Sequence, residues 1–195
     1  MNNEMFLFRK NALLNNLCKE WSDMWKACND NKERLFKLVL MQQSLPFFAD
    51  YCYRGKGLSK EYIAENFGDF TNGAYTGIDV DGVKGNYKTQ LYSDFKGTIE
   101  CNVDVLSIMY CDDVGLSIPQ RKCPKIYISN KSVVHLSADG YNYITVLLFD
   151  ESELVIEDKE ENTDVLVYKY SDKCKVTKGK YCLGKVNQFE KTLRL

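Results

Sequence analysis

The sequence lacks the features of a membrane protein or a secreted protein. No window approaches 18 consecutive apolar residues, so no segment is expected to span a bilayer. The opening residues, MNNEMFLFRKNALLNN, have neither the apolar core nor the small-residue cleavage site of a secretory signal. These absences predict a cytoplasmic protein that does not bind membranes.

Histidine is also scarce. It occurs once, at His135, which excludes H-E-x-x-H chemistry and zinc sites built from several histidines. The glycines form no phosphate-binding loop of the G-x-x-x-x-G-K-[ST] type. The eight cysteines lie far apart without a C-x-x-C pair, and without a secretory signal most are expected to be reduced core residues. We therefore predict no cofactor, no metal ion and no catalytic residue, and the chain is not expected to be an enzyme.

Charge is balanced over the whole chain and unbalanced locally. The net charge of −1 provides no overall attraction to nucleic acid. Residues 150–164 contain eight acidic residues and one lysine, whereas residues 169–195 contain eight basic residues and two acidic ones. An acidic block thus runs directly into a basic block. With 45% apolar residues in 195, the chain can bury the core of one domain.

The first third of the chain has helical periodicity. Apolar residues between positions 11 and 28 recur at helical spacing and predict one amphipathic helix. Start signals for further helices follow at Asp30 with Glu33, at Ser44 with Pro46, and at Ser59. Residues 1–68 are therefore predicted to form a helical cluster or cap. Residues 69–97, rich in Asn-Gly and Asp-Gly turn formers, are predicted to be a connection of loops and hairpins.

Residues 98–195 contain a repeat. Alternating apolar pairs recur about every 20 residues, and polar corners such as SNKS and SADG separate them. One series consists of Leu116 and Ile118, Val134 and Leu136, Leu154 and Ile156, and Cys174 and Val176. The second series consists of Ile126 and Ile128, Ile144 and Val146, and Val165 and Val167. The pattern predicts a repeat-containing β domain with two strands per unit.

Two architectures fit this repeat: a parallel β-solenoid, and an antiparallel β-sandwich with a helical cap. The charges favour the solenoid, because Glu153 would stack beneath Lys173 and Asp158 beneath Lys178 on adjacent coils. We therefore predict an α+β fold in which a helical cluster is followed by a short parallel β-solenoid. The helices would cover the first coil and the terminal segment VNQFEKTLRL would close the last.

The candidate partner-binding residues of the β domain are apolar or aromatic. They occupy the alternate strand positions whose side chains are expected to point away from the core. They are Leu147, Val155, Leu166, Tyr168 and Tyr170. A solenoid without a cover would leave them exposed, and contiguous patches of this kind mark interfaces. Either the helical cluster folds over them or another chain does.

The leading hypothesis is therefore a non-catalytic, cytoplasmic protein-binding or assembly module that binds a protein partner or associates with itself as a homo-oligomer. The composition, rich in Asn, Lys, Tyr and Asp, is common in low-GC bacteria and their phages. A narrower hypothesis is thus a small phage or mobile-element protein that binds a host factor.

Two other classes of function stay open. A groove-based enzyme or small-ligand binder on the solenoid would rest on His135, with Asp139 and Tyr143 nearby.

A single-stranded nucleic-acid binder would use the segment YCYRGKG, where Tyr51, Tyr53 and Arg54 could stack on bases and contact phosphate. A helix end with packed tyrosines explains this segment more simply. Nucleic acid is therefore not the expected partner.

Overall fold

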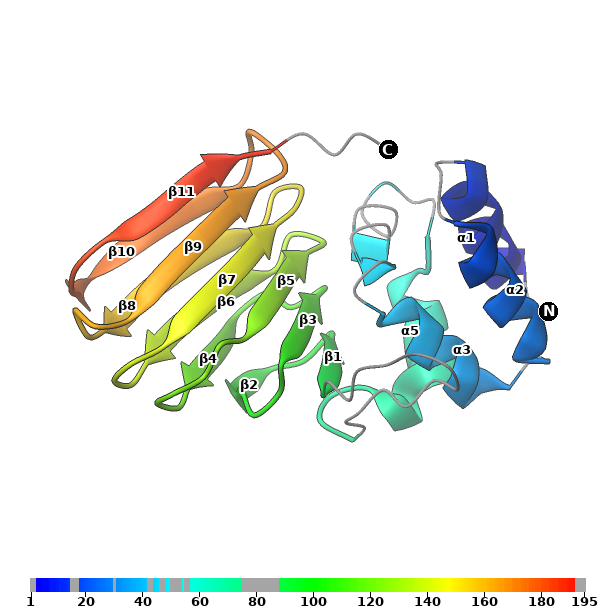
Figure 1. The fold of residues 1–195 in the computed structure, drawn as a ribbon, viewed down its shortest axis with the longest axis horizontal. Coiled ribbons are helices and arrows are strands. Elements are labelled where there is room, and N and C mark those ends of the chain that lie inside the picture. Colours follow the sequence, from blue (N-terminus) through cyan, green and yellow to red (C-terminus); the bar gives the residue numbers. More distant parts are fainter. Residues whose placement is uncertain are drawn as a thin grey trace.

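The protein is described by a computed structural model that covers residues 3–14, 18–29, 31–41, 44–45, 48–49, 54, 57–74 and 88–191. Its labelled helices are α1 (Asn3–Leu14), α2 (Lys19–Ala27), α3 (Lys32–Val39), α5 (Lys60–Phe67) and the 3-10 turn η1 (Gly68–Phe70). The strands are β1 (Thr89–Ser93), β2 (Gly97–Glu100), β3 (Val105–Met109), β4 (Val114–Ile118), β5 (Lys125–Ser129), β6 (Val133–Ala138), β7 (Tyr143–Leu148), β8 (Glu153–Lys159), β9 (Asp164–Lys169), β10 (Lys175–Cys182) and β11 (Val186–Glu190). The helices gather beside the β body, next to β1 (Figure 1).

Two helices, α1 and α2, lie where one long helix was predicted over residues 11–28. Cys18, which precedes α2, has an extended backbone (φ −62°, ψ 153°), so the prediction of a continuous helix is wrong. The break allows the two helices to pack together: the ring centroid of Phe8 is 6.2 Å from that of Trp21 and 6.2 Å from that of Trp25. Aromatic pairs contribute about 0.5–1.5 kcal/mol beyond their burial. Packing between the helices therefore favours the shorter segments.

Side-chain caps set the starts of α3 and α5. The side-chain oxygen of Asn31 accepts the N–H of Arg34 at 3.0 Å, so the cap of α3 lies one residue after the predicted Asp30. The predicted cap of α5 is confirmed, since the Ser59 hydroxyl accepts the N–H of Tyr62 at 3.1 Å. Each such cap is worth about 1 kcal/mol.

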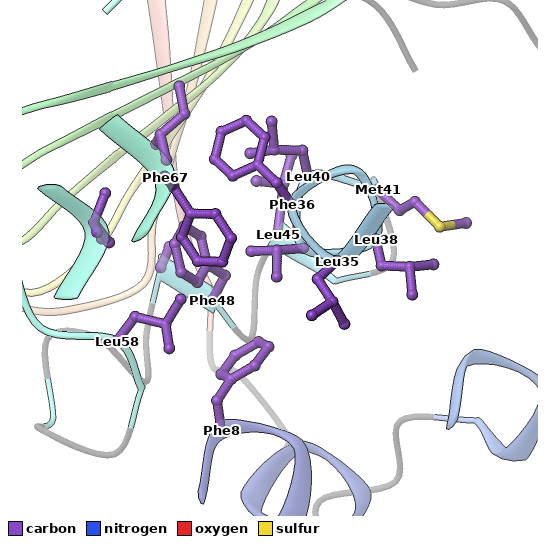
Figure 2. Packing of buried hydrophobic residues seen from close by; sticks show 14 of the residues in the cluster. Phe8, Leu35, Phe36, Leu38, Leu40, Met41, Leu45, Phe48, Leu58 and Phe67 are labelled. Carbon is purple, nitrogen blue, oxygen red and sulfur yellow. The ribbon is translucent and has the colours of Figure 1, made fainter. Parts of the chain in front are cut away.

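The helices share one aromatic core, shown in Figure 2. Ring centroids lie 5.8 Å apart for Phe8 and Phe48 and 5.3 Å apart for Phe36 and Phe67. Phe48 belongs to the short helix predicted after Ser44, of which the structure describes only residues 44–45 and 48–49. These contacts join residues that are far apart in sequence, so the cluster packs as one body.

The strands form two parallel sheets and confirm the β-solenoid. Sheet A has the order β1-β3-β5-β7-β9-β11, and sheet B has the order β10-β8-β6-β4-β2. The strand pairs of residues 88–191 are parallel, so the chain alternates between the sheets as it winds, and the antiparallel sandwich is not the fold. Strand β1, which lies within the predicted connection 69–97, pairs in parallel with β3. The turn formers at residues 81–82 and 85–86 lie outside the described residues, so the hairpins expected there stay a prediction.

Columns of inward side chains fill the space between the sheets. In sheet B the columns include Val114, Val134 and Leu154, and Leu116, Leu136 and Ile156. In sheet A they include Leu106, Ile126, Val146 and Val167, and Ile108, Ile128 and Leu148. All of these side chains are at most 1% exposed. Burying a side chain of this size contributes about 1.5–3 kcal/mol, so the columns supply the main stabilisation of the β body.

The prediction was correct about which residues face inward and about some neighbours, such as Val134 opposite Leu154 and Ile144 opposite Val165. For other pairs it was wrong by two residues. It paired Leu116 with Val134, whereas Leu116 lies opposite Leu136 in the structure. A shift of two residues leaves the same face of the strand pointing inward, so alternation alone cannot detect it.

The predicted ionic pairs between coils are likewise displaced. The predicted pairs were Glu153 with Lys173 and Asp158 with Lys178. In the structure Lys175 lies opposite Glu153, and Tyr181 lies opposite Asp158. Lys173 instead contacts Glu151, with Nζ 2.9 Å from the carboxylate, and Lys131 reaches the same carboxylate at 3.4 Å. Hydrogen bonds from Lys173 and Lys131 lower the pKa of Glu151 to about 2.

The helical cluster covers part of the outer face of sheet A. Outward residues of β1, β3, β5 and β7 belong to the same buried cluster as the helices, and each is at most 5% exposed: Leu91, Val105, Tyr127 and Leu147, with Phe149 just after β7. Two polar contacts reinforce the junction. The Tyr110 hydroxyl donates to the Leu58 carbonyl at 3.1 Å, and Lys60 lies 2.7 Å from Asp94.

Asn72 closes the free edge of β1. Its backbone N–H donates to the carbonyl of Leu91 at 2.9 Å. Its side-chain oxygen accepts the N–H of Ser93 at 2.9 Å, and its side-chain amide donates to the Ser93 carbonyl at 3.2 Å. Exposed edge strands invite pairing with other chains. The N-terminal part thus covers the first coil, as predicted.

Candidate functional site

The five candidate residues of the β domain do not share one surface. Leu147, Leu166, Tyr168 and Tyr170 lie on the side of sheet A that faces away from the core, whereas Val155 lies on the outer face of sheet B. Leu147 is 5% exposed beneath the helices. The helical cluster of the same chain therefore covers Leu147. A second chain could cover only the outward residues of sheet A that the helices do not reach.

The part of this face that the helices leave open is a strip formed by Leu166, Tyr168 and Phe189, which we call the β9–β11 strip. Leu147 lies opposite Tyr168, and Tyr168 lies opposite Phe189, so the strip continues a column that the helices bury. The rings of Tyr168 and Phe189 stack with centroids 5.3 Å apart. Phe189 is 45% exposed, and the Lys191 ammonium lies 5.4 Å from the centroid of the Tyr168 ring.

Tyr170 marks the limit of the helical cover. Its ring stacks on Phe149 with centroids 4.8 Å apart and planes 5° apart, and it packs against the helical core while remaining half-buried. Burial raises the pKa of the Tyr170 hydroxyl, and the neighbouring Tyr168 adds to the shift. The strip therefore borders directly on an interface that already exists within the chain.

The nucleic-acid candidates fall largely outside the described residues. Tyr51 and Tyr53 are not among the residues that the structure describes, and Arg54 is exposed. The prediction of base stacking by this segment stays a prediction.

His135 points away from the core of the solenoid, as the alternation predicts. Its Nδ1 is 2.8 Å from Glu157, and its Nε2 is 3.3 Å from Asp113. The interactions described for this ring go to these two carboxylates and not to Asp139 or Tyr143, the residues that the enzyme hypothesis invoked. Since both ring nitrogens have a carboxylate neighbour, the ring is arranged as a bridge across the outer face of sheet B.

Most of the described thiols are buried. The seven described cysteines are free, and four of them lie in the core: Cys28, Cys101, Cys111 and Cys174. Burial raises the pKa of each of these four, that of Cys174 to about 11. Because the thiolate is the nucleophilic form, these cysteines are suited to packing and not to covalent chemistry.

Alkylation of the native protein should follow this division. We expect iodoacetamide at neutral pH to modify the exposed Cys18 and Cys123 first and to reach Cys101 and Cys174 only after denaturant is added. Peptide mass spectrometry at successive times measures the rate at each site. Equal rates at Cys123 and Cys174 would show that the β body opens far more readily than its packing implies.

A buried lysine was not anticipated from the sequence. Lys159 is fully buried at the β8–β9 turn, and its ammonium donates to the Thr163 carbonyl at 2.8 Å and to the Glu160 carbonyl at 3.4 Å. A bulge in β8 inserts Glu157 as an extra residue, which reverses the alternation, so Lys159 lies opposite the inward-facing Ala138. These two hydrogen bonds link Lys159 to the β8–β9 turn from inside the solenoid.

Within the described residues, no group of three or more His, Cys, Asp or Glu side chains is placed to hold a metal ion. In that same part of the chain, no helix is both long enough and apolar enough to cross a bilayer.

Comparisons with known proteins add no family. No protein-family model, no curated protein and no solved structure matches this chain.

Proposed function

We propose that this protein is a non-catalytic binding module that holds a partner protein on the β9–β11 strip. The supporting observation is the continuity of the outer face of sheet A: the chain's own helices bury its apolar column at Leu147, and the same column continues through the half-buried Tyr168 to Phe189, which is 45% exposed. Contiguous apolar surface next to a packed interface is typical of binding sites.

The occupant that fits this surface best is an amphipathic helix of the partner. Helices already cover the neighbouring part of the face, so the sheet presents the same kind of outward side chains to both. The margin of the strip carries Lys185 and Lys191, which are exposed. A partner helix with apolar residues over Tyr168 and Phe189 and acidic residues along its edge would complement both features.

The proposal includes a cytoplasmic location and, in its narrower form, a small phage or mobile-element protein that binds a host factor. Both rest on the sequence alone. Self-association into a homo-oligomer through the strip is the competing outcome. The test below separates it from capture of a different protein.

An enzyme that uses His135 is the weaker candidate. Its one geometric feature is the bridge to Asp113 and Glu157, two exposed carboxylates, and Asp139 and Tyr143 are not among the described partners of the ring. The structure supplies no further argument for single-stranded nucleic acid, since Tyr51 and Tyr53 lie outside the described residues.

Removing the aromatic side chains of the strip should weaken partner binding strongly. The variant Tyr168→Ser/Phe189→Ser should retain at most about a tenth of the wild-type affinity, because buried aromatic residues carry much of the energy of an interface. The tagged full chain is used to capture proteins from a lysate of its natural source. A purified candidate partner is then titrated by calorimetry.

The matched control is Tyr141→Ser/Tyr143→Ser, which removes two aromatic side chains that are 65% and 48% exposed and lie outside the strip. The control should bind like the wild type, and thermal melting should show that both double variants are folded. Equal binding by the two double variants would contradict the proposal, as would recovery of nothing except copies of the chain itself.

A further inference from the structure

The last coil of the solenoid, formed by β10 and β11, has a neighbour on one side only. Strand β11 ends sheet A and β10 ends sheet B. This coil lies at the end of the β body opposite to the helices (Figure 1), so the cover that Asn72 and the helices give to β1 has no counterpart among the described residues here. Half of the backbone hydrogen-bonding groups of such an edge strand point away from the sheet.

The same coil is strongly basic. Within residues 169–191 the acidic residues are Asp172 and Glu190, and the lysines are Lys169, Lys173, Lys175, Lys178, Lys180, Lys185 and Lys191. Two such ends would repel each other. A second copy of the chain is therefore a poor partner for this surface.

Polar residues take over one inward column of each sheet in this coil: Lys178 lies opposite Ile156 and Gln188 lies opposite Val167. The other column of each sheet continues with a partly buried valine, Val176 opposite Leu154 and Val186 opposite Val165. An end-to-end contact would therefore find less apolar surface than the inner coils bury. Any partner of this edge is selected by backbone hydrogen bonds and by charge.

The pairing of β10 with β8 indicates the kind of strand that β10 binds. Its one neighbour, β8, is acidic, with Glu153 opposite Lys175 and Asp158 opposite Tyr181. The strands pair in parallel, and Lys175 N–H donates to the Ser152 carbonyl at 3.1 Å. Because alternate residues of a strand direct their N–H groups to opposite sides, the N–H of Val176 points away from β8, whereas that of Cys174 donates to the Ser171 carbonyl at 3.3 Å.

We infer that the free edge of β10 binds an acidic, extended segment of another protein, which adds to sheet B as β8 does on the other side. The lysines would attract this segment and exclude copies of the chain itself. Main-chain hydrogen bonds would hold it in place. The inference does not rest on the β9–β11 strip, and either site can fail without the other.

The test uses a labelled peptide with the sequence of residues 152–161, SELVIEDKEE, because β10 already pairs with this sequence. Fluorescence anisotropy measures its binding to the full chain at about 0.15 M salt, where long-range attraction is largely screened. We expect saturable binding by the wild type. We also expect at least about tenfold weaker binding by Lys175→Glu/Lys178→Glu/Lys180→Glu, since unlike charges attract and like charges repel across paired strands.

A charge-matched control variant, Lys10→Glu/Lys19→Glu/Lys32→Glu, reverses three exposed lysines of the helical part and should bind the peptide like the wild type. So should Tyr168→Ser/Phe189→Ser, because the strip lies on the other sheet. Loss of binding in either variant would place the peptide elsewhere and overturn the inference.

Two further probes separate strand pairing from simple attraction between charges. The same peptide with proline in place of Leu154 and Ile156 keeps its charge and cannot pair as a strand, so its binding should fall at least about tenfold. Equal binding of the proline peptide would overturn the inference. The same conclusion would follow from tighter binding of a single-stranded oligothymidylate, or from no binding of the acidic peptide at all.

Discussion

Replacing Leu147 by alanine should lower the free energy of unfolding by about 2–5 kcal/mol, the range for a buried leucine whose cavity cannot close fully. Leu147 points outward from β7 and is 5% exposed because the helical cluster lies over it. Both tryptophans, Trp21 and Trp25, lie in that cluster. Their fluorescence therefore reports unfolding of the helices, while circular dichroism of the strands reports the solenoid, during the same urea titration.

The matched control is Leu166→Ala on the next strand of the same sheet. Leu166 also points outward, but it lies beyond the helices and is half-buried. Truncating Leu166 to alanine should lower the free energy of unfolding by less than about 1 kcal/mol, as at other partly exposed positions. Equal losses at Leu147 and Leu166 would contradict the helical cover of sheet A, because only a cover makes the two leucines different.

Replacing Lys159 by methionine should lower the free energy of unfolding by about 1–3 kcal/mol. The substitution keeps an unbranched side chain of similar length and removes the ammonium that donates to the Thr163 carbonyl at 2.8 Å. That carbonyl would lose its described charged partner at the β8–β9 turn. The cost of leaving a buried acceptor unpaired is the reason for the expected effect.

The control for this substitution is Lys175→Met, which changes the same chemical groups at an exposed position of β10. It should alter the free energy of unfolding by at most about 0.5 kcal/mol. Buried charges can also be replaced by apolar groups without loss. An unchanged or increased stability of Lys159→Met would therefore show that the ammonium does not hold the turn.

The sequence was sufficient for the two-strand repeat because the solenoid repeats one pattern of alternating apolar and polar residues. The recurrence near 20 residues fitted both a parallel solenoid and an antiparallel sandwich, and the stacking of acidic residues beneath lysines favoured the solenoid. The solenoid is correct, although the particular charge pairs are displaced in the structure. Two features escaped this reasoning for physical reasons. A shift of two residues preserves alternation, so Leu116 was paired with the wrong neighbour. The bulge at Glu157 reverses alternation, so Lys159 was not recognised as inward-facing.

The candidate surface was only partly predictable. The alternation of side chains along the strands predicted that both Leu147 and Leu166 point outward. Nothing in the local sequence distinguishes the buried Leu147 from the half-buried Leu166. The difference comes from helices that end at Phe67, 80 residues before Leu147. Phe189 was missed because its segment was interpreted as a closing end, although its register opposite Tyr168 makes it part of the exposed column.

The most direct test of the proposed function is photo-crosslinking from the strip in cells that naturally make the protein. The photoreactive residue p-benzoylphenylalanine replaces Phe189 in one variant and Tyr141, which is 65% exposed and lies outside the strip, in a control variant. We expect one partner protein to crosslink from position 189 through a helical segment, to be absent at position 141, and to be lost when Tyr168 is changed to serine. Crosslinks only to copies of the chain, or the same products from both positions, would contradict the proposal.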